Sequence, residues 1–149
     1  MNTPFLQTKE ETIKFLKKYE IKNYTINPDL TVDVDGDVSL NGKNLTKIPV
    51  KFKTVTGDFF CYRNNLTSLE GSPATVGGYF YCYNNKLTSL EGSPTTLGGY
   101  LYCSENPLSK DTLINFVFDK RIKVIFNDFK LKNLPKEGES KAEWLLRIF

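Results

Sequence analysis

The stretches Gly57-Asp-Phe-Phe-Cys61, Gly78-Tyr-Phe-Tyr-Cys82 and Gly99-Tyr-Leu-Tyr-Cys103 share one pattern and begin 21 residues apart. The same interval separates three asparagines and three leucines that follow them, namely Asn64, Asn85, Asn106, Leu66, Leu87 and Leu108. A fixed period of this length is the sequence signature of a repeat architecture, in which each copy packs only against its neighbours. We therefore expect the middle of the chain to form a stack of 21-residue copies.

A degenerate copy precedes the three clear ones. One period earlier, the chain keeps apolar or small residues at the equivalent positions, which are Val34, Gly36, Val38, Leu40, Leu45 and Ile48. This copy departs from the pattern at Lys43, which stands where the later copies have asparagine. The repeat region is therefore predicted to span residues 34–108, with about four copies.

The segment Phe80-x-Cys82-x-x-Asn85-x-Leu87 resembles the central motif of a leucine-rich repeat, L-x-L-x-x-N-x-L. In that motif, a short parallel strand is followed by a turn that the asparagine amide holds. Inward residues alternate along such a strand, and a buried asparagine satisfies backbone groups that would otherwise lack partners. The expected fold class is an α/β-type repeat: a short leucine-rich-repeat solenoid with a parallel sheet, a helical N-terminal cap and an α+β C-terminal cap.

Residues 1–33 are expected to cover the N-terminal end with a helix and a hairpin. Thr8-x-x-Glu11 is a capping-box signature. It opens an amphipathic stretch with an apolar side formed by Ile13, Phe15, Leu16 and Tyr19. Residues 24–34 have the pattern of extended chain broken near Asn27-Pro28-Asp29, which is typical of a hairpin.

Residues 109–149 are expected to close the other end, because the terminal parts of a repeat array must cover its core. Residues 109–118 have a helical pattern and residues 122–126 a strand pattern, and Ser140-x-x-Glu143 opens a final helix. The pattern does not place the first of these helices relative to the strand surface.

The outward positions of the repeated strands carry aromatic residues. If Phe59, Phe80 and Leu101 point inward together with the cysteines, the residues between them point outward. The candidate partner-binding residues at these positions are Asp58, Phe60, Tyr62, Tyr79, Tyr81, Tyr83, Tyr100 and Tyr102. Because neighbouring strands lie ~4.8 Å apart, equivalent rings would form ladders across the sheet. Six of the eight tyrosines are thus predicted to share one surface.

Two interpretations fit this surface. Tyrosine supplies a large contact area at low entropy cost together with a hydroxyl, so binding surfaces are enriched in it. Cross-strand stacking that merely stabilises the sheet is the alternative, but it does not require three outward tyrosines on one strand, as at Tyr79, Tyr81 and Tyr83. We therefore predict a binding surface. Acidic residues at one end of it would suit a partner with a basic rim: Asp33, Asp35, Asp37 and Asp58.

The sequence offers no catalytic or metal-binding constellation. It contains no histidine, which is the commonest general base and zinc ligand. Cys61, Cys82 and Cys103 occupy the position that Leu40 holds in the first copy, which favours core packing over redox or metal chemistry. The acidic residues 33–37 lack the glycine and glutamate spacing of a calcium loop. We expect a protein that is not an enzyme and uses no metal or cofactor.

Composition predicts a single globular domain in the cytoplasm. Apolar residues make up 40% and charged residues 25%, close to globular averages, and the net charge of +3 does not demand a nucleic-acid partner. No apolar run approaches the ~20 residues of a membrane span, and the first residues are charged where a signal peptide would be apolar. We therefore expect no membrane association.

The repeat is also similar to the short leucine-rich repeats of small bacteriophage and bacterial proteins, through Leu87-Thr-Ser-Leu-Glu-Gly-Ser-Pro94 and the Gly-Gly-Tyr-x-Tyr-Cys that follows. Its length resembles the proline-containing repeats of secreted bacterial effectors, without their separate ubiquitin-ligase domain. The resemblance covers residues 24–108 and implies a scaffold that binds proteins. A phage origin would imply a host or host-defence protein as the target, bound and inhibited in the host cytoplasm.

Binding of a glycan or of single-stranded nucleic acid is the alternative that the residues leave open, because rings on a sheet also accept sugars and bases. Basic residues near the last copy could contact phosphate: Lys110, Lys120, Arg121 and Lys123. Strong dependence of binding on salt would indicate the nucleic-acid version. The identity of the partner and the oligomeric state also stay open.

Overall fold

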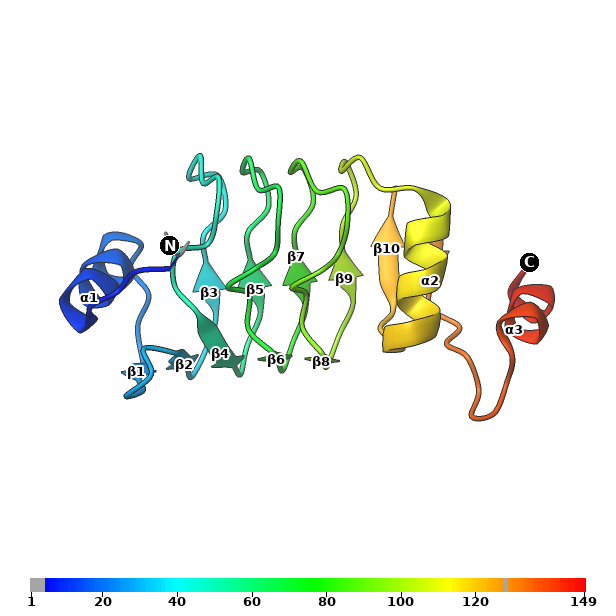
Figure 1. The fold of residues 1–149 in the computed structure, drawn as a ribbon, viewed down its shortest axis with the longest axis horizontal. Helices are drawn as coiled ribbons and strands as arrows, with labels where there is room; N and C mark the ends of the chain where they lie inside the picture. Colours follow the sequence, from blue (N-terminus) through cyan, green and yellow to red (C-terminus); the bar gives the residue numbers. More distant parts are fainter. Residues whose placement is uncertain (1–4, 128) are drawn as a thin grey trace.

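The computed structural model describes residues 5–127 and 129–149. These residues form an α/β arrangement with two sheets of mostly parallel strands, three helices and no closed barrel. Figure 1 shows the strands side by side along the molecule, with α1 (Lys9–Lys18) at one end and α2 (Lys110–Lys120) and α3 (Lys141–Ile148) at the other. The predicted α/β class with parallel strands is confirmed.

The larger sheet contains the repeated strands in the order β11-β10-β9-β7-β5-β3. Its strands are β3 (Val38–Ser39), β5 (Phe59–Phe60), β7 (Phe80–Tyr81), β9 (Leu101–Tyr102), β10 (Val124–Phe126) and β11 (Phe129–Leu131). The first four are parallel, and equivalent residues of successive copies lie side by side, so the repeat period sets the register. The strand predicted within residues 122–126 is confirmed as β10, which pairs in parallel with β9. The antiparallel β11 was not predicted.

The second sheet has five strands in the order β1-β2-β4-β6-β8 and was not predicted. Its strands are β1 (Tyr24–Ile26), β2 (Val32–Val34), β4 (Phe52–Val55), β6 (Thr75–Val76) and β8 (Thr96–Leu97). The expected hairpin is confirmed as the antiparallel pair β1 and β2. From β3 to β9, the chain alternates between the two sheets. Two-residue strands beside glycine and proline show no alternation of apolar residues, so periodicity cannot reveal them.

The inward side chains of the repeated strands form the core between the two sheets. Phe59 and Phe80 are completely buried, and their rings stack with centroids 5.2 Å apart and an interplanar angle of 6°. The three cysteines are completely buried as well, at the next inward position: Cys61, Cys82 and Cys103. Removal of this apolar surface from water is the main force that holds the copies together.

The asparagine of each copy joins that copy to the preceding one. The side-chain amide of Asn85 donates to the carbonyls of Cys82 and Cys61, both at 3.0 Å. Its Oδ1 accepts from the N–H of Leu66, also at 3.0 Å. The same bridging contacts recur at two equivalent residues, Asn64 and Asn106. Because β3 is the edge of its sheet, no earlier copy needs such a bridge, and Lys43 can replace the asparagine.

Capping hydrogen bonds confirm the predicted helix starts. In α1, the Thr8 hydroxyl accepts from the backbone of Glu11, whose carboxylate accepts from the backbone of Thr8. Ser140 and Glu143 make the same pair of bonds at the start of α3. The hydroxyl of Ser109 caps α2. These bonds satisfy N–H groups that a helix start otherwise leaves unpaired.

The helix α2 packs on the inward side of the larger sheet, and α3 lies beyond it at the C-terminal end of the molecule (Figure 1). Leu113 and Val117 of α2 belong to the same buried core as Phe80 and Leu101. Trp144 of α3 is completely buried, and its indole N–H donates to the carbonyl of residue 133 at 2.7 Å. Among the described helices, none combines the length and the apolar character needed to cross a membrane.

Candidate functional site

The outward side of β5, β7 and β9 brings together all eight residues that were predicted as partner-binding. This surface is called the tyrosine face here and consists of Asp58, Phe60, Tyr62, Tyr79, Tyr81, Tyr83, Tyr100 and Tyr102. Strand alternation places these side chains opposite the buried phenylalanines and cysteines. Since α2 packs with the inward residues, it lies on the other side of the sheet and leaves the tyrosine face uncovered.

Three ladders of stacked rings run across the tyrosine face. The central ladder joins Phe60 to Tyr81 at 4.9 Å between ring centroids and Tyr81 to Tyr102 at 4.8 Å. A second ladder stacks Tyr62 on Tyr83 at 4.5 Å. The third ladder is looser and consists of two rings 6.3 Å apart, Tyr79 and Tyr100. The ring planes within each pair lie within 13° of parallel. The predicted aromatic ladders are therefore present.

Stacking leaves the rings half-buried rather than fully exposed. Tyr79 is the most open ring of the face, with 39% of its surface exposed. Burial, and secondly the charge of Asp58, raise the pKa of the Tyr81 hydroxyl. Burial also raises the pKa of Tyr83 and Tyr102, with smaller contributions from neighbouring tyrosines. These hydroxyls are consequently protonated at neutral pH and can donate hydrogen bonds.

The acidic end of the face is made by two carboxylates that also bind backbone. Oδ1 of Asp58 accepts from the N–H of Tyr79 at 2.7 Å, and Oδ1 of Asp37 accepts from the N–H of Asp58 at 2.7 Å. The sequence pattern placed Asp33 and Asp35 at the same end. Asp33 instead lies on β2, in the second sheet, and accepts from the side chain of Asn27. The acidic end of the face therefore includes Asp37 and Asp58 but not Asp33.

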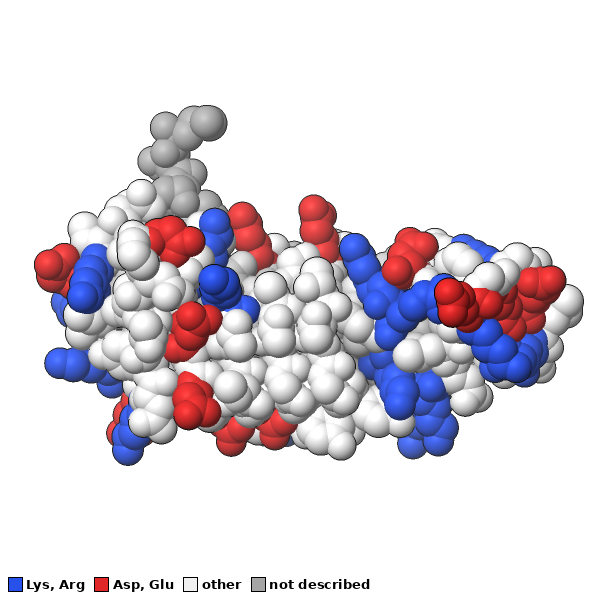
Figure 2. Space-filling model, turned by 90° about the horizontal axis from the view of Figure 1, so that it is seen from below, with Lys and Arg blue, Asp and Glu red and all other residues white. Residues whose placement is uncertain are grey.

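The opposite end of the face is basic. Lys123 extends toward Tyr100, and its ammonium lies 5.6 Å from the ring centroid, within range of a cation–π contact. Ile125 of β10 lies beside Tyr102, and Lys130 of β11 lies beside Ile125. In Figure 2, acidic groups along the lower edge over the repeats give way to a basic group toward the C-terminal end. The 21-residue period ends before these residues, so it could not predict that they lie beside the tyrosine face.

Only one of the four basic residues proposed for phosphate contact reaches the tyrosine face, namely Lys123. Lys110 begins α2, which packs on the inward side. Lys120 ends the same helix and lines a pocket there. Arg121 donates to the carbonyl of Pro135. The structure therefore does not gather these four side chains into one phosphate-binding group.

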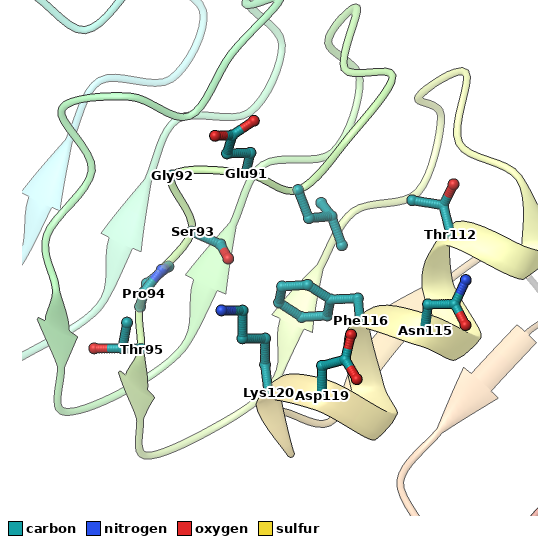
Figure 3. A pocket seen from close by; sticks show the side chains of 11 residues that line it. Glu91, Gly92, Ser93, Pro94, Thr95, Thr112, Asn115, Phe116, Asp119 and Lys120 are labelled. Atoms are coloured by element: carbon teal, nitrogen blue, oxygen red, sulfur yellow. The ribbon is translucent and has the colours of Figure 1, made fainter. Parts of the chain in front are cut away.

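A pocket of about 590 Å³ lies on the side opposite the tyrosine face, between α2 and the loop before β8. Figure 3 shows Phe116 and Lys120 extending from the helix toward this loop. The pocket is lined by Leu90, Glu91, Gly92, Ser93, Pro94, Thr95, Thr112, Asn115, Phe116, Asp119 and Lys120. It was missed because the sequence could not place the helix against the repeats.

The cysteines and acidic residues show no grouping suited to metal or redox chemistry in the part of the chain that is described. Burial raises the pKa of all three thiols, that of Cys103 to about 12, so they stay protonated and inert. Among described residues, no three metal-ligating side chains of the Cys, Asp or Glu type converge.

A scan against protein-family models found no match, and searches of the curated proteins and of the solved structures found none either.

Proposed function

We propose that this chain is a non-enzymatic leucine-rich-repeat protein that binds another protein through the tyrosine face. Residues 34–108 supply the solenoid, residues 1–33 its N-terminal cap and residues 109–149 its C-terminal cap. The motif resemblance and the asparagine bridges support the repeat class. The observation that carries the binding proposal is the set of three adjacent ring ladders on one uncovered surface.

The way in which the rings stack favours a protein partner. Within each ladder, one ring covers the flat side of the next, so the surface presents ring edges and hydroxyls. Fixed rings lose little conformational entropy on binding, and tyrosine combines apolar area with a hydrogen-bond donor. A partner surface with an apolar centre fits this arrangement. Its rim would be basic opposite Asp58 and acidic opposite Lys123.

The target is proposed to be a bacterial host protein, bound in the host cytoplasm, with inhibition of a host or host-defence protein as the result. Support for this step comes from the resemblance to bacteriophage and bacterial repeat proteins alone. Fold resemblance indicates a binding scaffold and does not identify a target.

Binding of a glycan or single-stranded nucleic acid is the second candidate, and Lys123 beside Tyr100 is the observation that favours it. Sugars and bases stack on the open flat side of a ring. In the central ladder, the ring of Tyr81 is covered on both sides, by Phe60 and Tyr102. The other six rings stand at ladder ends and have one side outside the stack. The nucleic-acid version is nevertheless the weaker one, because Lys123 alone among the four basic residues proposed for phosphate contact reaches the tyrosine face.

Affinity capture from bacterial lysate tests the proposal. The wild type is compared with a double variant, Tyr81→Ala with Tyr102→Ala, that circular dichroism shows to be folded. A matched control replaces two exposed threonines of the turns, Thr67→Ala with Thr88→Ala. We expect one protein to be retained by the wild type and the control and lost from the tyrosine variant.

Two results would contradict the proposal. Equal retention of the captured protein by all three forms would exclude the tyrosine face as its binding surface. Retention of nucleic acid or glycan in place of protein, with nucleic-acid affinity falling steeply as salt rises, would favour the second candidate.

A further inference from the structure

The second sheet ends at β8, whose outer edge pairs with no described strand. Where β8 pairs with β6, the carbonyl of Ala74 accepts from the N–H of Thr96 at 3.1 Å, and that of Val76 accepts from Gly98 at 3.0 Å. The carbonyl of Gly78 accepts from the N–H of Gly99 at 2.8 Å. Three carbonyls of one copy thus bind the next copy.

The equivalent carbonyls of the last copy have no donor. They belong to Thr95, Leu97 and Gly99, and no described residue donates a hydrogen bond to them. The apolar side chains at this edge are also less buried. Val55 and Val76 are completely buried, whereas the equivalent Leu97 is only partly buried. An edge with a row of unpaired backbone groups is a template for a further strand.

No described residue supplies that strand, because α2 follows where a fifth copy would continue. Beyond its first turn the N–H groups of α2 bond within the helix, and no backbone hydrogen bond among the described residues joins this helix to the edge carbonyls. The pocket between α2 and the loop before β8 remains instead. Its volume of about 590 Å³ lies in the range of ligand-binding pockets.

We propose that this edge and the adjoining pocket bind an extended segment of a partner protein, which adds to β8 as a parallel strand. The site is separate from the tyrosine face and does not depend on the function proposed for it. Addition of a strand gives affinity through backbone hydrogen bonds and specificity through the pockets beside them.

The structure also indicates which sequence such a segment needs, because the molecule already binds two copies in the same way. A Cβ on Gly77 would lie 2.2 Å from the carbonyl oxygen of Thr56, and a Cβ on Gly98 would lie 1.9 Å from that of Gly77. A further strand in the same register would meet the backbone of Gly98 in the same way, so the segment is expected to carry glycine at the equivalent position. At the first junction, where the register between β2 and β4 shifts, this position holds Thr56.

The residues before this glycine would enter the pocket. In the last copy, Pro94 is buried, and it lines the pocket together with Phe116 of α2. A proline or another compact apolar residue four positions before the glycine of the segment would contact both Pro94 and Phe116. The predicted ligand class is an extended peptide of the form Pro-x-x-x-Gly, with x variable.

The test uses a synthetic peptide, Ser-Pro-Thr-Thr-Leu-Gly-Gly, which reproduces residues 93–99. It is titrated into the isotope-labelled full chain while the backbone amides are followed by NMR. A matched peptide has alanine in place of the first of its two glycines. Because the peptide changes and the protein does not, misfolding of a variant cannot affect the result.

We expect saturable shifts at Leu97, Thr95 and Phe116, with a Kd between about 0.1 and 1 mM for so short a segment. The alanine peptide should bind about tenfold more weakly or worse, because its methyl group meets a backbone oxygen. Absence of saturable shifts, equal affinity of both peptides, or shifts confined to the tyrosine face would each overturn the proposal. So would a concentration-dependent dimer in which a second copy covers Leu97.

Discussion

The inner and outer ring ladders of the larger sheet have the same geometry and different exposure. Phe59 stacks on the inward Phe80 at 5.2 Å with planes 6° apart, and Phe60 stacks on the outward Tyr81 at 4.9 Å with planes 5° apart. The inner pair is completely buried, while the outer pair is half-buried.

The difference in exposure distinguishes the rings that stabilise the fold from the rings that the fold does not require. The inner ladder shows that phenylalanine alone suffices for stacking across parallel strands. Every further ring of the outer ladders carries a hydroxyl and lies at the surface, where stacking contributes less than full burial does. We therefore expect the inner side to determine stability and the outer side to determine binding.

The largest effect is expected from Phe80→Ala on the inner side. Loss of a buried ring and its stacking partner should lower the free energy of unfolding by about 3–5 kcal/mol, as for other large-to-small core substitutions. Urea denaturation measures this value. A loss below about 1 kcal/mol would show that the core can rearrange and that the inner ladder does not determine stability.

Asn85→Ala should come next. It leaves the buried N–H of Leu66 without its acceptor and removes one of the two asparagine donors from the carbonyls of Cys61 and Cys82, at a cost of about 2–3 kcal/mol in unfolding free energy. Lys43→Ala provides the matched control, because the same position of the first copy is exposed and makes no bridge. Similar losses in the two variants would contradict the bridging role of asparagine.

Tyr81→Ala should lower the free energy of unfolding by only about 1–2 kcal/mol, because the ring is half-buried. Its effect on binding should be larger, with affinity for the captured protein falling about tenfold or more, as expected of a central aromatic contact. Urea denaturation and calorimetric titration give the two numbers. A large loss of stability with unchanged affinity would make Tyr81 a structural residue.

Tyr81→Phe should change the unfolding free energy by less than about 0.5 kcal/mol near neutral pH, because it keeps the ring and its stacking. A difference in unfolding free energy between the wild type and this variant should appear at alkaline pH. Burial raises the pKa of Tyr81 in the folded chain, so the unfolded chain releases its proton first. Wild-type stability should be unaffected below the ordinary tyrosine pKa of about 10 and fall as pH rises through the folded value. The variant should lose less stability in urea titrations across this range, and identical pH profiles would contradict the assignment.

Much of the fold follows from the sequence because the period fixes register. Once Phe59, Phe80 and Leu101 are inward, the strand period of two places the intervening tyrosines outward. The asparagine positions and the helix caps are equally local signals, which explains why they were predicted correctly. The composition of the tyrosine face needed no tertiary information.

The missing parts depend on contacts between segments that share no pattern. Neither β8 nor its open edge is visible in the sequence, because Thr96-Leu97 is followed by two glycines and shows no alternation. The contact of Lys123 with Tyr100 requires β10 to add beside β9 after an intervening helix. Such placements arise from packing rather than from local propensity.

The most direct test of the binding surface uses the tyrosines themselves. Six of the eight lie on the tyrosine face, while Tyr19 and Tyr24 lie elsewhere and serve as internal controls. Tyrosine-selective isotope labelling allows NMR to follow the ring signals of the intact chain as bacterial lysate is added. We predict that signals of the six face residues broaden or shift while those of Tyr19 and Tyr24 do not. Uniform behaviour of all eight tyrosines would contradict a protein-binding role for this face.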